Sequence, residues 1–165
     1  MPISFFDLLA DDGWEPLAFD PADPSFYWND GGFMTTAPVD ITATFDGAMW
    51  HSTNVEPAFK WRGRRIRPGF IVPKRHHNLR QLTIVVGGSI EVECGADDMQ
   101  GVVGGQGVAG GEKRHIGPSE FWVAEPGVPY TVTAGPEGVT YLECWDDAMM
   151  LAETYWHDDP HWKRR

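Results

Sequence analysis

Short runs of apolar and β-branched residues, separated by glycine and proline, recur along most of this chain. They predict strands over residues 41–45, 59–61, 65–72, 82–86, 90–94, 121–124, 130–133 and 139–145. In the run 90–94, apolar residues alternate with two glutamates, which is typical of a half-buried strand. Many short strands of this kind favour a sandwich or a barrel, so the predicted fold class is all-β.

Glycines predict where the chain turns. Gly87 and Gly88 lie between two apolar runs and predict a tight hairpin, because a two-residue turn of this kind requires positive φ angles. The glycine-rich segment 95–118 contains the spacing of a dinucleotide-binding loop, but no helical period follows it. We therefore interpret the segment as a hairpin connection and its His115 as a loop residue.

The two ends of the chain follow other patterns. A short helix is predicted from Ser4 to about Ala10, and a segment rich in proline, aspartate and glycine follows later. We divide the single domain into an irregular N-terminal arm (1–40), a β-rich body (41–146) and a C-terminal extension (147–165). The start of the extension fits either a short helix or an edge strand.

Composition and charge argue against several classes of partner and location. The 165 residues carry a net charge of −11, which argues against binding to nucleic acid or to an anionic membrane. Basic residues gather at 60–67, where strand alternation divides them between two faces, and we favour a solvated or subunit-facing strand over an anion site. The chain lacks the basic start of a secretory signal and any apolar run of about 18 residues. We therefore expect a cytoplasmic protein with Cys94 and Cys144 reduced.

Residues 69–88, GFIVPKRHHNLRQLTIVVGG, combine a glycine, paired histidines, a short polar segment, an apolar run and a closing glycine. This order resembles the first motif of the cupin family, in which two histidines and a glutamate bind a metal. Laid on this chain, the histidine positions fall on Arg75 and His77, and the glutamate position falls on Gln81. The closing glycine is Gly88.

A second stretch, residues 120–130 (EFWVAEPGVPY), resembles the second cupin motif, which ends in a third histidine. Gly127 matches its glycine, and Tyr130 takes the histidine position. The resemblance implies a double-stranded β-helix, or jelly-roll barrel, over residues 41–146, with a ligand site at the barrel mouth and a homodimeric assembly. Because cupins include many kinds of enzyme and binding protein, this fold by itself selects no reaction.

Substitutions in the two motifs change the expected chemistry. Positions 75, 77 and 81 share parity, so Arg75, His77 and Gln81 are expected on one face of the barrel, facing Tyr130. A guanidinium cannot bind a metal and repels cations, so the affinity for a divalent metal should fall. The set suits a small polar or anionic ligand, with Arg75 as an anion clamp, Gln81 as a hydrogen-bonding partner, and His77 and Tyr130 as catalytic residues.

Two structural alternatives stay open at this point. A bulge could turn His76 inward, so that His76, His77 and Gln81 hold iron, manganese, nickel or zinc. Glu143 either lies inside the barrel as a ligand-binding residue or points to solvent, depending on which face of the run 139–145 is buried. We favour exposure of Glu143.

The function predicted from these features is the binding of a small molecule inside the barrel. We favour an enzyme of small-molecule metabolism, such as an oxygenase, an isomerase or a lyase, with a divalent metal left open. The alternative is a non-catalytic cupin that senses or sequesters a ligand without metal.

Overall fold

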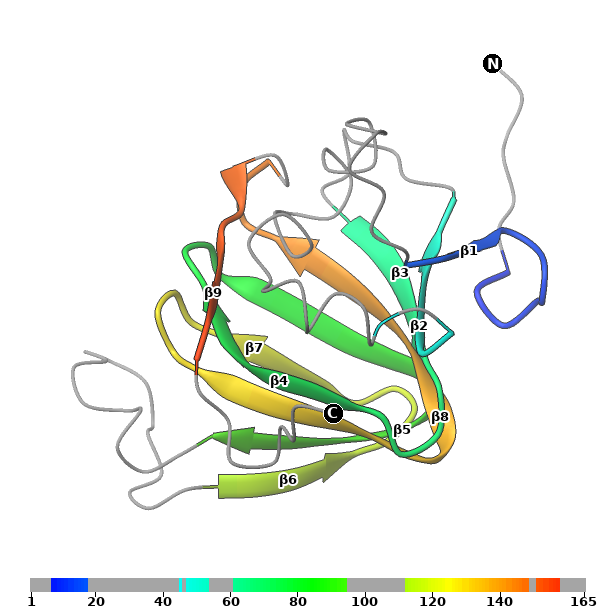
Figure 1. The fold of residues 1–165 in the computed structure, drawn as a ribbon. Coiled ribbons are helices and arrows are strands. Elements are labelled where there is room, and N and C mark those ends of the chain that lie inside the picture. The colour runs from blue at the N-terminus through cyan, green and yellow to red at the C-terminus, as the bar shows by residue number, and fades with distance from the viewer. Residues whose placement is uncertain are drawn as a thin grey trace.

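The structure is a computed structural model, and it describes residues 7–17, 45, 47–53, 61–94, 112–148 and 151–157. Strands dominate this part of the chain, which confirms the all-β prediction (Figure 1). The strands are β1 (Trp14–Pro16), β2 (Met49–Ser52), β3 (Trp61–Ile66), β4 (Ile71–His77), β5 (Gln81–Cys94), β6 (Glu112–Ile116), β7 (Phe121–Ala124), β8 (Tyr130–Trp145) and β9 (Thr154–Trp156).

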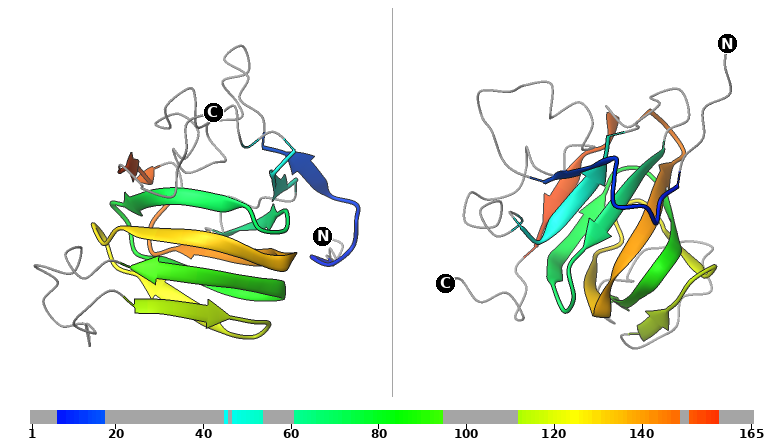
Figure 2. Two further views of the ribbon diagram at one scale, coloured as in Figure 1. Left: turned by 60° about the horizontal axis from the view of Figure 1, so that its bottom comes forward. Right: turned by 90° about the vertical axis from the view of Figure 1, so that its right-hand side faces the viewer.

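Two long strands, β5 and β8, form the middle of the fold and pair with each other along most of their length. The first half of β5 and the second half of β8 lie in one sheet, in the order β1, β2, β3, β8, β5, β7. The other two halves lie in a second sheet, in the order β9, β4, β8, β5, β6. All pairs are antiparallel, and the two sheets are continuous with each other because β5 and β8 run through both. Figures 1 and 2 show that the two sheets face each other. This arrangement is a jelly-roll barrel.

The predicted hairpin at Gly87 and Gly88 is wrong, because β5 runs through both residues and bends there. Gly88 has a φ of 70°, and Gly138 of β8, at the same bend, has a φ of 79°. A Cβ atom on Gly88 would lie 2.1 Å from the carbonyl oxygen of Gly138. The glycines are therefore needed for the close approach of two bent strands, and the chain does not reverse at this point.

The Gly88→Ala variant is expected to be less stable than the wild type by more than about 1–3 kcal/mol, the usual cost of a positive φ in a residue other than glycine. The excess comes from the contact between the new methyl group and Gly138. Gly69→Ala is a matched control, because Gly69 has a φ of 68° but a Cβ atom added to it would meet no atom within 4 Å. Urea unfolding should show a clearly larger loss for Gly88→Ala. Equal losses would contradict the role of this contact.

Several predicted strands have different ends in the structure. The predicted strand 65–72 is divided between β3 and β4, because Pro68 and Gly69 form a turn. The predicted strands 82–86 and 90–94 are parts of β5, and 130–133 and 139–145 are parts of β8. Residues 41–44 and 59–60 of other predicted strands lie outside the described residues.

Both ends of the chain differ in part from their predictions. Residues 7–10, the described part of the predicted helix, form turns and a bend, so a helix is not found there. β1, from the predicted arm, pairs with β2, and β9 shows that the extension forms an edge strand.

His115 lies on β6 with an exposed side chain and is therefore not a loop residue. The segment 95–118, predicted to be a connection, contains β6, which pairs with β5, while its residues 95–111 lie outside the described part.

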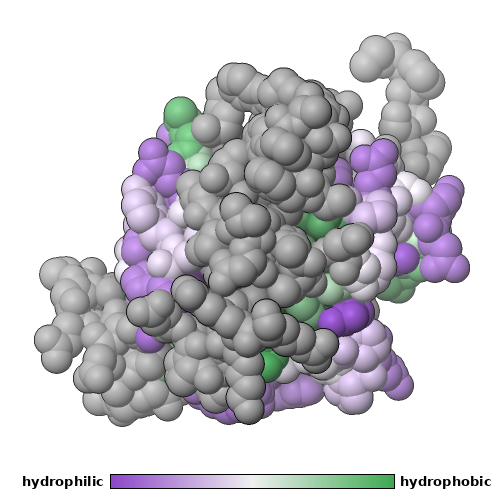
Figure 3. All heavy atoms as spheres, viewed as in Figure 1, coloured by the Kyte–Doolittle hydropathy of each residue, from purple (hydrophilic) through white to green (hydrophobic). Residues whose placement is uncertain are grey.

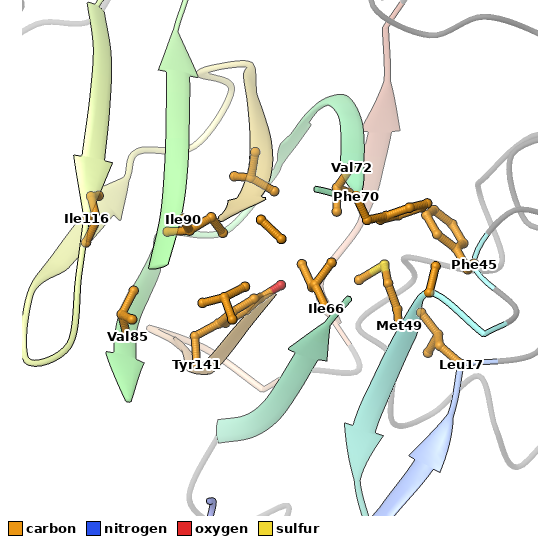
Figure 4. Close-up of a cluster of buried hydrophobic side chains, with 14 of the residues drawn as sticks. Leu17, Phe45, Met49, Ile66, Phe70, Val72, Val85, Ile90, Ile116 and Tyr141 are labelled. Atoms are coloured by element: carbon orange, nitrogen blue, oxygen red, sulfur yellow. The ribbon is translucent and has the colours of Figure 1, made fainter. Parts of the chain in front are cut away.

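The hydrophobic core lies between the two sheets (Figure 4). Phe45 and Phe70 pack edge to face, with ring centroids 6.1 Å apart. Most of the labelled side chains in Figure 4 come from strands of both sheets, with Leu17, Phe45 and Phe70 added from the segments next to them, and they point towards one another. On the face seen in Figure 3, the described side chains at both flanks are mainly hydrophilic, and hydrophobic ones show only in small areas. Among the described residues, no helix is long and apolar enough to cross a membrane.

Candidate functional site

Polar side chains gather on the inner face of the barrel, at the end where β5 begins and β8 ends. Strand alternation places them there, because every second residue of a strand faces the same side. None of the following is more than 6% exposed, and we refer to them together as the inner polar cluster: Arg62, Arg64, Arg75, His77, Gln81, Thr83, Tyr130, Tyr141, Glu143 and Thr154. The cluster draws on β3, β4, β5, β8 and β9, so both sheets contribute to it.

Arg75, His77, Gln81 and Tyr130 come together inside this cluster. The Tyr130 hydroxyl donates a hydrogen bond of 2.7 Å to Gln81 Oε1, which joins the two sheets. The Arg75 guanidinium carbon lies 4.8 Å from the centre of the Tyr130 ring, close enough for a cation–π interaction. The His77 ring lies 6.4 Å from the same ring, and His77 Nδ1 is 3.1 Å from Thr154 Oγ1. The catalytic and binding roles of these residues stay predictions.

His76 does not join them. It lies between Arg75 and His77 on β4 and faces the outer side of the sheet, where its ring stacks on Tyr155 at 4.8 Å. β4 has an irregularity between Val72 and Arg75, but it leaves the alternation of the histidine pair intact. His76 therefore lies on the opposite face of the sheet from His77 and Gln81, so the three residues do not form the metal site that was predicted as an alternative.

The prediction that Glu143 points to solvent is wrong, because its side chain lies inside the barrel and the residue is only 6% exposed. Its Oε2 atom accepts hydrogen bonds from Arg62 Nε at 3.2 Å and Arg62 Nη2 at 3.0 Å. Arg64 Nε lies 3.5 Å from the same oxygen. The buried carboxylate is therefore stabilised by two guanidinium groups from the neighbouring strand.

The basic run at 60–67 is predicted to be a solvated or subunit-facing strand, and that prediction is wrong for Arg62 and Arg64, which are 2% and 1% exposed. Both share parity with Ile66, a core residue, whereas Gly63 faces the outer side against Trp14. The shared parity with a core residue indicated that Arg62 and Arg64 face inward. Because basic side chains are seldom buried, the sequence nevertheless favoured solvent for them.

Burial controls the protonation of the titratable groups. Desolvation, aided by the nearby Arg75, lowers the pKa of His77 to about 3, so its ring is neutral near pH 7. Burial raises the pKa of Tyr130 to about 12, which keeps its hydroxyl a hydrogen-bond donor. Burial also opposes ionisation of Glu143, but Arg62 and Arg64 outweigh it and hold the pKa of the Glu143 carboxyl below its usual value.

Two further groups at this end were not found from the sequence. Thr83 lies directly across from Glu143 in the strand register and is fully buried, but its Oγ1 atom has no hydrogen-bond partner. Trp145 Nε1 is likewise buried without a partner, although the Arg62 guanidinium lies 5.1 Å from its ring. Buried polar atoms are almost always paired, so these two indicate a place for water or a ligand atom.

The inner polar cluster does not fit the divalent metal that the cupin resemblance implies. Arg75 brings a positive charge to one ligand position, and the Tyr130 hydroxyl is committed to the neutral amide of Gln81. Within the described residues, no three histidine, cysteine, aspartate or glutamate side chains are grouped closely enough to hold a metal ion. The chemistry of this donor set favours an anion over a cation.

A hollow of about 510 Å³ lies away from this cluster. Its lining includes Leu9, Trp14, Trp50, Arg65 and the bend at Gly88. These residues belong to the N-terminal segment, to β2 and β3, and to the bend of β5. The hollow and the inner polar cluster are therefore separate features.

Comparison with known proteins links the chain to a fold. No protein-family model and no curated protein matches its sequence. Two solved structures of oxalate decarboxylase from Bacillus subtilis, one of them a point mutant, align with it at 17% and 16% identity. Their TM-scores are 0.52 and 0.50, and each alignment covers 66% of this chain but only 28% of the enzyme. A likeness at this identity concerns the backbone alone, and it agrees with the strand order described above. The chain has the jelly-roll barrel fold of the cupins.

Proposed function

We propose that this chain binds a small anionic molecule, such as a hydroxylated carboxylic acid, on the inner face of the barrel. The observation that carries the proposal is that Thr83 Oγ1, in the inner polar cluster, and Trp145 Nε1, whose ring lies beside the Arg62 guanidinium, are buried without hydrogen-bond partners. A ligand that reached both atoms would satisfy hydrogen-bonding groups that folding has already removed from water.

The chemistry of the surrounding residues defines the class of ligand. A guanidinium such as that of Arg75 recognises a carboxylate through two parallel hydrogen bonds. The Trp145 indole is a donor only, so it requires an acceptor oxygen, whereas the Thr83 hydroxyl can donate or accept. The Tyr130 hydroxyl and the Gln81 amide are bonded to each other at the same end, but the hydroxyl oxygen can still accept a hydrogen bond and the amide nitrogen can still donate one. A compact molecule with a carboxylate and one or more hydroxyl groups matches this set.

The protonation states favour binding over acid–base catalysis. Efficient general acids and bases have pKa values near the working pH. His77, with a pKa of about 3, is a weak base at neutral pH, and Tyr130, with a pKa of about 12, is a weak acid. The proposed role is therefore that of a ligand-sensing or ligand-sequestering protein that works without a metal.

Arg75→Ala is expected to weaken binding of the ligand about 10–100-fold, because a hydrogen bond to a charged group contributes about 1.5–3 kcal/mol. The measurement is the rise in melting temperature of the untagged protein with a panel of small hydroxy acids and dicarboxylates, since a ligand that binds only the folded state stabilises it. Arg80→Ala is the control, because Arg80 is on the outer surface, paired with Glu125.

A second variant separates binding from folding. Thr83→Val removes the Oγ1 atom but keeps the shape of the side chain, and the lost hydroxyl has no partner in the protein. The variant should be as stable as the wild type without ligand and should bind the ligand more weakly. Equal stabilisation of the wild type, Arg75→Ala and Thr83→Val by every compound would refute the site. Consumption of a bound compound by the wild type, lost in His77→Ala, would support the enzyme instead.

A further inference from the structure

We propose that His76 and His157 form a binding site for a divalent transition metal, such as zinc or nickel, on the outer face of the barrel. His76 Nδ1 and His157 Nε2 face each other at 2.7 Å. The two rings have centroids 4.9 Å apart and an angle of 52° between their planes. This site shares no residue with the inner polar cluster, and its existence does not depend on the proposed function.

The geometry needs only a small adjustment to admit a metal. In a tetrahedral zinc site, two histidine nitrogens at 2.0–2.1 Å from the metal lie roughly 3.3 Å apart. The pair at 2.7 Å would therefore have to open by roughly 0.6 Å. His157 is exposed and follows the last residue of β9, so its side chain is less constrained than a buried one. The remaining coordination positions would face solvent and be filled by water.

Imidazole nitrogens are good ligands for zinc, copper and nickel, provided that the rings are neutral. The His76 ring also stacks on Tyr155, whose hydroxyl donates a hydrogen bond to Glu153. These contacts hold the His76 ring in the orientation in which it would bind the metal.

The site joins two strands that also contribute to the inner face. β4 and β9 pair through Arg75 with Trp156, His76 with Tyr155, and His77 with Thr154. A metal held by His76 and His157 would therefore fasten β9 to β4 from outside, while Thr154 contacts His77 from inside. Figure 1 shows β9 lying along β4 at the side of the barrel.

The test uses untagged, chelator-treated wild-type protein titrated with zinc chloride and, separately, nickel chloride, with binding followed by calorimetry. Wild-type protein should bind one metal ion per chain. Mutation of a residue that only supports a metal ligand usually weakens metal binding about 10–100-fold. His76→Ala and His157→Ala each remove a direct ligand, so each should weaken binding by more than this. His115→Ala is the matched control, because His115 is an exposed strand histidine on β6, and it should bind as the wild type does.

Hydrogen exchange supplies a readout that non-specific binding to the acidic surface would not change. Metal should slow exchange of the β9 amides in the wild type and in His115→Ala, but not in His76→Ala or in the conservative His76→Asn. The proposal is overturned if the wild type shows no saturable binding. It is also overturned if both histidine variants, shown by circular dichroism to be folded, bind with wild-type affinity.

Discussion

Glu143→Ala is expected to lower the free energy of unfolding by about 3–5 kcal/mol, the usual cost of removing one member of a buried ion pair. The Glu143 carboxylate accepts two hydrogen bonds from Arg62 and lies 3.5 Å from Arg64 Nε. Its loss would leave two guanidinium groups, both nearly inaccessible to water, without this source of negative charge. Urea unfolding at pH 7, followed by circular dichroism, measures the change.

The control for Glu143→Ala is Glu125→Ala, which breaks an ion pair of similar geometry on the surface. Glu125 Oε2 lies 2.8 Å from Arg80 Nη2, and the two side chains are 39% and 55% exposed. Surface pairs are screened by water and contribute little, so Glu125→Ala should be close to wild type in stability. Glu143→Gln keeps an acceptor oxygen and should fall between the two alanine variants. If Glu143→Ala and Glu125→Ala are equally stable, the inner ion pair does not support the fold.

The regular part of the barrel could be predicted because it depends on local patterns. Alternation of apolar and polar residues identified the body of β5 and β8, and the first cupin-like motif placed Arg75, His77 and Gln81 at one parity. The bend at Gly88 could not be distinguished from a hairpin, because both need glycine at a positive φ. The difference lies in Gly138, whose carbonyl meets Gly88 only after the strands pair.

The charged interior could not be predicted for a related reason. A buried arginine is unfavourable in general, so the sequence of β3 favoured solvent for its basic residues. What makes burial of Arg62 tolerable is Glu143, which is distant in sequence and comes opposite it only through the register of β3 and β8. The position of Glu143 depends in turn on Arg62 and Arg64, so neither strand could be assigned its inner face without the other.

The pH dependence of stability should depend strongly on His77. Its pKa is about 3 in the folded protein, against 6.5 for an ordinary histidine, because burial and Arg75 disfavour the charged ring. Between these values the unfolded chain binds a proton that the folded protein does not, so stability falls as the pH falls. Full protonation of the unfolded state would cost on the order of 5 kcal/mol by pH 3. His51, with a pKa lowered to about 4, acts in the same direction.

Replacing His77 with glutamine should therefore flatten the dependence of unfolding free energy on pH between 6.5 and 3. Glutamine cannot be protonated in this range, but it can still form a hydrogen bond with Thr154, the partner of His77 Nδ1. Each variant is compared with its own stability at pH 7, so that any loss of packing in His77→Gln is removed from the comparison. Glu143 also loses its charge in acid, but Arg62 and Arg64, which contribute more than His77 to lowering its pKa, are kept in both proteins, so most of that contribution cancels. His115→Gln, altered at an exposed histidine, should keep the wild-type slope. A wild-type slope in His77→Gln would show that His77 takes up its proton in the folded barrel as readily as in the unfolded chain, and its ring would then not be held neutral for binding.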